Sequence, residues 1–402
     1  MYLSKDEESI LNGEKGEILK KLMNLVVSVG EVMGADRMIE ITSVQVSGIS
    51  YKNIGEPGLN FLKEIADSNV QAVVPTFINP AGCDLQNYNM QQISEEFFKK
   101  QLEVVHQFKR MDIIPTCSCT PYLIGLKPLF GDHISWAESS AVAFANSVIG
   151  ARTNREGGPA ALASALLGKT ANYGLHLDEN RKPTHLFVID EKLKLQFDVD
   201  WSLLGYSIGR EINEGVPYII ANKRPHMTNL KAISAGLAAS GAIGLFHLDK
   251  ITPEANVEKN YLSKLEKTTI TKESIKQTQE ILTLKRERMN FICIGCPHSS
   301  IDELYYVEKL TKSKKLIEGY RFWICTSRYT KTQADEGGIT EKLNSRGILI
   351  VADTCPVVAP LSETSIKGMV TNSSKAAHYM PKTNNIPTIV KSIEDIVNEF
   401  FE

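Results

Sequence analysis

Three cysteines of this chain lie where an apolar, strand-like run ends in a turn. They are Cys119, Cys296 and Cys355, and the last two follow the apolar runs 291–294 and 348–351. In an open α/β sheet, the carboxyl ends of the strands form the crevice where ligands bind. Three thiolates that converge there suit an iron–sulfur cluster that keeps one iron free for a substrate. Such a cluster would make this protein a hydro-lyase.

The spacing of the cysteines leaves other interpretations open. Cys293 and Cys296 form a CxxC motif, which is typical of a redox dithiol, but such a motif usually opens a helix near the start of a thioredoxin-like unit. A structural zinc site normally takes four ligands, and Cys325 or His298 could complete one. Cysteine is also among the residue types most often fully buried, so the pattern alone favours scattered core cysteines over a metal or cluster site.

Two polar turns and one lysine are candidates for binding an anion. The amides and hydroxyls of the Ser-Gly-Ile-Ser segment 47–50 could wrap a phosphate or a carboxylate, or the segment could be a simple turn. Arg152 and Arg155 lie beside a glycine turn and have the shape for bidentate contacts, although a solvated loop would have the same composition. Lys375 is, from its surroundings in the sequence, an ordinary surface lysine.

Glu138 is the candidate acid or base. It precedes Ser139 and Ser140 and adjoins an apolar helical stripe that includes Ala141 and Phe144. If it is partly buried there, its carboxylate would accept hydrogen bonds or titrate as an acid or base. At the start of a helix, the same carboxylate would simply be favoured by the helix dipole. The sequence pattern leaves both interpretations open.

The overall composition describes an ordinary globular protein. The 402 residues allow two or three domains, and a net charge of −2 with 23% charged residues gives no sign of a nucleic-acid surface. Uncharged apolar runs stay well short of the roughly 18 residues of a membrane span. The acidic N-terminus does not resemble a signal peptide, so we expect a cytoplasmic protein whose seven cysteines stay reduced.

Hydrophobic periodicity predicts the elements that position these residues. Ser4 and Glu7 predict a capping box that opens the first helix. Further helices are expected over 58–67 and 97–108, and an apolar helical stripe over 133–150. Strands are expected over 39–46, 71–77, 184–189 and 217–221, and near residues 291, 322 and 348. This rhythm indicates α/β layers on a largely parallel sheet. We expect an N-terminal α/β region over 1–250, a linker with a surface helix over 251–289, and a C-terminal α/β domain over 290–402.

Taken together, these segments resemble the catalytic large subunit of the aconitase X family over essentially the whole chain. The matching stretches are 47–55, 79–82, 119–122, 133–158, 295–298, 326–328 and 353–360. The resemblance implies α/β/α layers like the first three domains of aconitase, two of which would fall within 1–250, with the active site in the cleft between domains. It also implies that the swivelling fourth domain is a separate small subunit, so that the enzyme is a heterodimer.

The resemblance further implies the roles of individual residues. A [4Fe-4S] cluster with one iron open to substrate would be held by Cys119, Cys296 and Cys355. The remaining cysteines would be structural, namely Cys83, Cys117, Cys293 and Cys325. Substrate contacts are implied at Gly48, Ile49, Ser50, Asn79, Pro80, Glu138, Ser139 and Lys375. Glu138 and Ser139 are the candidates for the catalytic base, and a residue of the small subunit could replace either.

Within the family, the segment 47–52 is similar to that of the archaeal phosphomevalonate dehydratases. The implied reaction is dehydration of (R)-5-phosphomevalonate to trans-anhydromevalonate 5-phosphate in isoprenoid biosynthesis. Cys83 departs from the methionine usual after Pro-Ala-Gly, so the packing of that loop stays open. One alternative is a dehydratase of cis-3-hydroxy-L-proline or another hydroxy acid on the same scaffold. An alternative of another class is a non-catalytic subunit that binds a metal or an iron–sulfur cluster.

Overall fold

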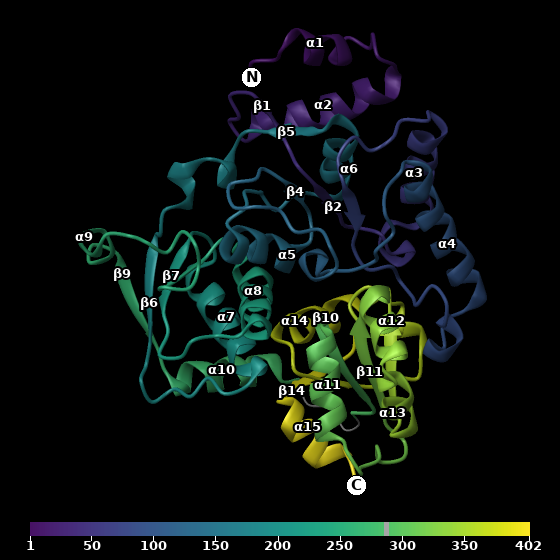
Figure 1. The fold of residues 1–402 in the computed structure, drawn as a ribbon, viewed down its shortest axis with the longest axis vertical. Helices are drawn as coiled ribbons and strands as arrows, with labels where there is room; N and C mark the ends of the chain where they lie inside the picture. The colour runs from purple at the N-terminus through teal and green to yellow at the C-terminus, as the bar shows by residue number, and fades with distance from the viewer. Residues whose placement is uncertain (285–288) are drawn as a thin grey trace.

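The strands of the chain fall into four separate sheets in the computed structural model, which describes residues 1–284 and 289–402. Three of these sheets are entirely parallel and are covered by helices, as Figure 1 shows. They define an N-terminal, a middle and a C-terminal region along the chain. The expected α/β class with a largely parallel sheet content is confirmed.

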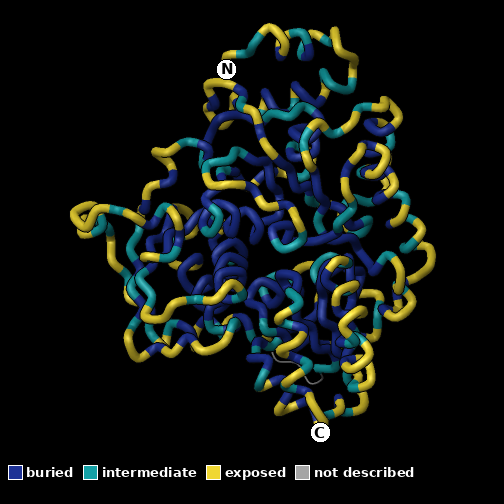
Figure 2. The backbone as a smooth tube through the Cα atoms, in the orientation of Figure 1, coloured by how far each residue is buried: buried dark blue, intermediate teal, exposed yellow. Residues whose placement is uncertain are grey.

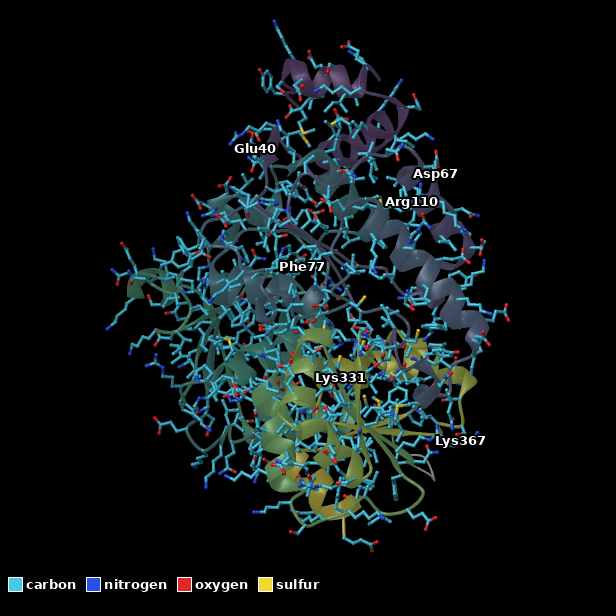
Figure 3. All side chains as sticks on the ribbon, turned by 45° about the vertical axis from the view of Figure 1, so that its right-hand side comes forward. Glu40, Asp67, Phe77, Arg110, Lys331 and Lys367 are labelled. Carbon is cyan, nitrogen blue, oxygen red and sulfur yellow. The ribbon has the colours of Figure 1, made fainter. Side chains whose placement is uncertain are left out.

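The N-terminal region is built on a three-stranded parallel sheet. Its central strand β2 (Val44–Val46) pairs with β3 (Thr76–Ile78) and β4 (Ser135–Trp136). A separate antiparallel pair joins β1 (Met38–Glu40) to β5 (Lys169–Ala171). The helices of this region are α1 (Lys5–Leu11), α2 (Glu17–Val32), α3 (Tyr51–Asp67), α4 (Glu95–Arg110), α5 (Ser139–Phe144) and α6 (Gly158–Leu167). On the outer face, Arg110 of α4 forms a 2.8 Å ion pair with Asp67 of α3 (Figure 3).

The predicted capping box is present, while two predicted strands and one predicted helix have different bounds. Ser4 N–H donates to Glu7, and Glu7 N–H donates back to the Ser4 hydroxyl. The stretch 39–46 divides into β1 and β2 because its two halves pair with different sheets, and the strand expected over 71–77 is limited to β3. The helix expected within 133–150 begins only at α5, because residues 135–136 first pair with β2 as β4.

The middle region carries a four-stranded parallel sheet in the order β8-β7-β6-β9. Its strands are β6 (His185–Ile189), β7 (Pro217–Ile220), β8 (His247–Leu248) and β9 (Glu266–Ile270). Helices α7 (Asp198–Ile212) and α8 (Met227–Gly241) pack closely, since a Cβ at Gly236 would clash with the carbonyl oxygen of Ser202. The stretch 251–289, expected as a linker with a surface helix, contains the helices α9 (Lys259–Leu262) and α10 (Lys272–Leu282). It also contains β9, which pairs with β6 and completes this sheet.

The C-terminal region holds a five-stranded parallel sheet in the order β12-β11-β10-β13-β14. Its strands are β10 (Phe291–Ser299), β11 (Arg321–Thr326), β12 (Ile348–Ala352), β13 (Met369–Thr371) and β14 (Thr388–Val390). The helices are α11 (Ile301–Leu310), α12 (Arg328–Glu336), α13 (Ile339–Ser345), α14 (Ser374–Thr383) and α15 (Ile393–Phe400), with Lys331 of α12 labelled in Figure 3. The strands expected near residues 291, 322 and 348 are therefore present.

Buried residues fill the interior of each region and also the places where regions meet (Figure 2). Helix α14 of the C-terminal region, for example, packs against α7 and α8 of the middle region. Ser202 of α7 and Ser374 of α14 share a 2.7 Å hydrogen bond between their hydroxyls at this junction. In the described part of the chain, no helix combines the length and apolar character needed to cross a membrane.

Candidate active site

Loops at the carboxyl ends of two parallel sheets contact each other. The N-terminal sheet contributes the loops after β2, β3 and β4, and the C-terminal sheet contributes those after β10, β12 and β13. The Ser50 hydroxyl, after β2, donates to the carbonyl oxygen of Val358, after β12, at 2.8 Å. The Ala81 N–H, after β3, donates to the carbonyl oxygen of Asp353 at 2.8 Å. Carboxyl ends of parallel strands are where ligands bind in such sheets, which makes this junction the candidate active site.

The three predicted cluster ligands lie at this junction and are buried. Cys296 is near the end of β10, Cys355 follows β12, and Cys119 follows the segment that bridges to β3. Burial raises the pKa of the Cys119 thiol, and the charges of Glu138 and Cys355 raise it further. Burial likewise raises the pKa of Cys355 to about 11, and burial and Cys355 raise that of Cys296. The three thiols therefore lie close enough to affect one another's ionisation.

The three buried thiols are of the donor type that an iron–sulfur cluster takes. Among residues 1–284 and 289–402, no group of three or more His, Cys, Asp or Glu side chains is arranged to hold one metal ion. A cluster of several irons needs its thiolates spread around a larger body. Cys119, Cys296 and Cys355 lie on three separate segments of the chain, which is consistent with that requirement. Soft thiolates are also the ligands that iron–sulfur clusters select.

Glu138 and Lys375 meet at the same junction. Glu138 is the N-cap of α5 and accepts hydrogen bonds from Ala141 N–H and the Ser140 hydroxyl, both at 2.7 Å. Its carboxylate also forms a buried ion pair with the Lys375 ammonium. Burial would raise the pKa of Glu138, but the Lys375 charge and these hydrogen bonds hold it below its usual value. Burial opposes the charge on Lys375, yet Glu138, Cys296 and Cys119 raise its pKa. Both side chains are therefore charged, and Lys375 is not a surface lysine.

The predicted substrate residues line the loops after β2 and β3. Gly48, with a φ of 78°, turns the chain after β2 so that Ile49 and Ser50 lead into the N-terminus of α3. The amide of Gln101, on α4, holds this turn, because it donates to Ile49 O and accepts from Tyr51 N–H, both at 3.0 Å. It also accepts from Gly82 N–H at 2.8 Å, which ties in the loop that begins with Asn79 and Pro80. Gln101 is a positioning residue that the sequence did not single out.

Asn79 has an unused polar atom at this junction. Its Oδ1 is buried and accepts no hydrogen bond from the described residues. Its backbone N–H donates to Val46 at 2.9 Å, which fixes the residue at the end of β3. A buried acceptor without a partner is costly unless a ligand or water supplies the donor. The atom is consistent with a substrate contact at Asn79.

Other residues that the sequence singled out have different surroundings. Arg152 pairs with Asp178 and donates to the carbonyl oxygen of His176 at 3.1 Å, and Arg155 is exposed. The Cys293 and Cys325 sulfurs are 3.7 Å apart between β10 and β11. Cys83 and Cys117 are buried as well. The CxxC motif thus pairs Cys293 with a cysteine of the next strand rather than with Cys296.

An ionic bridge across the junction was not predicted from the sequence. Arg328, at the start of α12, binds Asp353 through Nε at 3.1 Å and Asp84 through Nη2 at 2.5 Å. Asp84 also accepts from Ala352 N–H at 3.0 Å, and Asp353 accepts from Leu85 N–H at 3.2 Å. The loops after β3, β11 and β12 are therefore held together by one guanidinium. Arg328 belongs to the stretch 326–328 that matches the family, but no role for it is predicted from the sequence.

Family models cover almost the whole chain. Residues 1–179 match the model described as the aconitase X first domain, residues 183–280 the second domain and residues 289–402 the third domain. The chain is also similar to a solved structure, that of Thermococcus kodakaraensis aconitase X in its holo-form, with a TM-score of 0.91 and 40% identity over 100% of both chains. The aconitase-like fold expected from the resemblance is confirmed.

Similar proteins in other organisms are dehydratases. The chain is 46% identical to the phosphomevalonate dehydratase large subunit of Methanocaldococcus jannaschii, covering 99% of each chain. It is 41% identical to the large subunit of Methanothermobacter thermautotrophicus, covering 95% of this chain and 94% of the relative. The cis-3-hydroxy-L-proline dehydratase of Hypocrea jecorina is more distant, at 29% identity over 94% of this chain and 65% of its own. The chain belongs to the aconitase X family.

Proposed function

We propose that this chain is the large subunit of a phosphomevalonate dehydratase. The enzyme removes water from (R)-5-phosphomevalonate to give trans-anhydromevalonate 5-phosphate, in the cytoplasm and as a step of isoprenoid biosynthesis. The observation that carries the proposal is the similarity to phosphomevalonate dehydratase large subunits, which extends over 99% of both chains for the relative with 46% identity. The coupled cysteines beside the Glu138–Lys375 pair support the reaction class.

A [4Fe-4S] cluster is assigned to Cys119, Cys296 and Cys355, with one iron left open. When bound, it supplies a Lewis acid for a tertiary hydroxyl, which is otherwise a poor leaving group. Three buried thiols with an ammonium nearby fit this group, because Lys375 lowers the pKa of each of these thiols against the effect of burial. Thiolates are the form in which cysteine binds iron.

The chain's own residues bind and orient the substrate. The backbone amides of Gly48, Ile49 and Ser50 at the start of α3 offer donors to one anionic end. Oδ1 of Asn79, which lacks a donor among the described residues, accepts from a substrate hydroxyl. Lys375 binds the other anionic end. Holding both ends aligns the C–H and C–O bonds for elimination.

Glu138 and Ser139 are the candidates for the base within this chain. The Ser139 hydroxyl lies 3.4 Å from Oε1 of Glu138. In the free protein Glu138 is a weak base, because Lys375 holds its pKa below the usual value. A substrate carboxylate that competes for Lys375 weakens this effect and makes Glu138 a better proton acceptor. A residue of the small subunit is the alternative base.

The partner proposed for this chain is a small subunit that carries the aconitase-like swivelling domain. The relatives that match over their full length are named large subunits, which implies a smaller partner for them. The cis-3-hydroxy-L-proline dehydratase of Hypocrea jecorina is longer, and this chain covers only 65% of it. A heterodimer of a large and a small chain is consistent with both facts.

The test is anaerobic co-expression with the small subunit, followed by parallel assays. Phosphomevalonate and cis-3-hydroxy-L-proline are supplied separately, and the products are identified by mass spectrometry. We expect loss of water from phosphomevalonate only. Turnover of cis-3-hydroxy-L-proline without turnover of phosphomevalonate would replace the proposed substrate. Absence of iron and sulfide from anaerobically purified protein would remove the cluster from the proposal.

A further inference from the structure

His298 contacts all three segments that carry the predicted cluster ligands. It follows Cys296 by two residues within β10. Its backbone N–H donates to Sγ of Cys119 at 3.2 Å. Its ring Nε2 lies 3.0 Å from the carbonyl oxygen of Thr354, the residue before Cys355. One fully buried residue therefore connects the segments of Cys119, Cys296 and Cys355.

The partners of the imidazole determine its tautomer. Thr354 offers a carbonyl oxygen, which only accepts, so Nε2 of His298 carries the proton and donates. Nδ1 is then an acceptor, and it receives the hydroxyl proton of Ser118, whose Oγ is 3.2 Å away. Both ring nitrogens are used, so His298 in this arrangement does not complete a zinc site. A neutral imidazole instead links Ser118 to Thr354.

The hydrogen bonds continue beyond the imidazole on both sides. Because Ser118 gives its proton to His298, its oxygen accepts from the N–H and the hydroxyl of Thr120, both at 3.2 Å. Lys231 of α8 donates to the carbonyl oxygen of His298 at 2.8 Å. Ser118 and Lys231 therefore both contact this histidine, and Thr120 holds Ser118 in place. We call Thr120, Ser118, His298 and Thr354 the histidine network.

The histidine network joins loops that neither sheet can align alone. Cys119 belongs to the N-terminal region, whereas Cys296 lies in β10 and Cys355 follows β12 of the C-terminal sheet. Each sheet fixes its own loops, but the distance between the two sets depends on contacts across the junction. His298 supplies such contacts within two residues of each of the three cysteines. Metal sites depend on outer hydrogen bonds of this kind to orient their ligands.

We propose that His298 is a positioning residue that fixes the three cysteine segments relative to one another before a cluster binds. The inference rests on the proposed function, because it takes these cysteines as the cluster ligands. It assigns to the imidazole two separable contacts: donation from Nε2 to Thr354 and acceptance at Nδ1 from Ser118. Loss of either contact leaves a buried polar group without its partner.

The test separates these two contacts in the full chain. His298→Gln retains an amide donor toward Thr354 and loses the acceptor for Ser118, whereas His298→Asn retains the acceptor and loses the donor. His298→Leu loses both. His247→Gln is the matched control, because His247 is also buried and its Nε2 lies 2.7 Å from the carbonyl oxygen of Arg181, which belongs to none of the three cysteine segments. If the His298 variants do not fold, Ser118→Ala removes the same contact from the other side.

Two readouts are measured. After anaerobic reconstitution with iron and sulfide, we expect His298→Gln and His298→Asn to lose iron to a chelator about tenfold faster than wild type. His298→Leu should lose iron faster still. Before reconstitution, alkylation of Cys119 and Cys355 by iodoacetamide, followed by mass spectrometry, is expected to be faster in the same order. The control is expected to keep both wild-type rates.

The outcomes distinguish the inference from the proposed function. Wild-type rates of both iron loss and alkylation in every folded network variant would overturn the role of His298 and leave the function standing. A wild-type chain that binds no iron and sulfide would overturn the cluster assignment. In that case the alkylation rates still decide whether His298 holds the cysteine segments together.

Discussion

The ammonium of Lys375 is paired with the carboxylate of Glu138 inside the protein, across the contact between the C-terminal and N-terminal regions. Lys375 is 8% exposed and Glu138 is 6% exposed. Lys375 lies in the first turn of α14, and Glu138 caps α5, so the pair also fixes two helix starts. Each charge is stable at this depth only because the other is present.

Lys375→Met should destabilise the protein more than the double variant Lys375→Met/Glu138→Gln. The single change leaves the Glu138 carboxylate buried without its counter-charge, which costs about 3 kcal/mol. The double change removes both charges and should recover most of that loss. Urea denaturation of the cluster-free chain at neutral pH measures the difference. Equal stability of the single and double variants would show that the two charges are not coupled.

Glu138→Gln should retain the iron and sulfide of the wild-type enzyme but lose turnover. The amide keeps the size of the carboxylate but has no charge to hold Lys375 and cannot take a proton. Visible absorbance and iron content report the cluster, and the phosphomevalonate assay reports turnover. A kcat near that of the wild type would exclude Glu138 from the chemistry and leave Ser139 or the small subunit as the source of the base.

Arg328→Gln should loosen the contact between the loops after β3 and β12. It leaves Asp84 and Asp353 buried close together without the guanidinium that binds both. We expect a stability loss of about 3 kcal/mol and faster iron loss, because Asp353 lies two residues before Cys355. Arg346→Gln is the control, since Arg346 binds Glu308 at 2.8 Å entirely within the C-terminal region. The control should lose stability without faster iron loss, and the same iron loss in both would argue against a role for the bridge.

The sequence predicted the members of the site better than the contacts that hold them. The cysteines and the segment 47–50 were visible because each follows an apolar run, and strand ends gather at one edge of a parallel sheet. Glu138 stayed ambiguous because its partner Lys375 is 237 residues away in the chain. The surroundings of Lys375 in the sequence predict a surface lysine, and only the family resemblance points to it as a site residue, since burial at a junction between regions leaves no local pattern.

The structural roles of Arg328, Gln101 and His298 are not predicted from the sequence for a related reason. Each acts through contacts with loops that are distant in sequence, such as the 244 residues between Arg328 and Asp84. Hydrophobic periodicity reports which face of an element is buried, and it carries no information on which buried polar groups meet. The same limit explains why strand β9 is not predicted. Its residues are mostly polar, and it forms a strand because it pairs with β6, which is distant in the sequence.

Gly295→Ala should disturb the Cys296 segment directly. Gly295 has a φ of 92°, and a Cβ there would clash with the carbonyl oxygen of Cys325 on the neighbouring strand β11. Gly319→Ala is a matched control, because its φ is 91° and nothing lies within 4 Å of its Cβ position. The control should lose only the conformational term of about 1 kcal/mol. Gly295→Ala should lose clearly more in urea denaturation of the cluster-free chain, and equal losses would show that β10 moves aside without cost.

Glu156 should make stability depend on pH between about 4.5 and 7. Its side chain is 6% exposed, and its Oε1 finds no partner among the described residues. Burial raises its pKa from 4.5 to about 7. Between these values the folded protein holds a proton that the unfolded chain has lost, so stability falls as the pH rises through this window. Above pH 7 both states are ionised, and the loss stops growing.

Glu156→Gln removes this titration and should be less sensitive to pH over the same window. The free energy of unfolding of the variant, relative to wild type, should rise by on the order of 3 kcal/mol from pH 4 to pH 8. Urea denaturation at a series of pH values measures this difference, in which the other titrating groups cancel. Glu179→Gln, at an exposed position, should leave the pH dependence of wild type unchanged. A constant difference between Glu156→Gln and wild type would mean that the pKa of Glu156 is the same in the folded and the unfolded chain, so that a donor or water at Oε1 offsets the effect of burial.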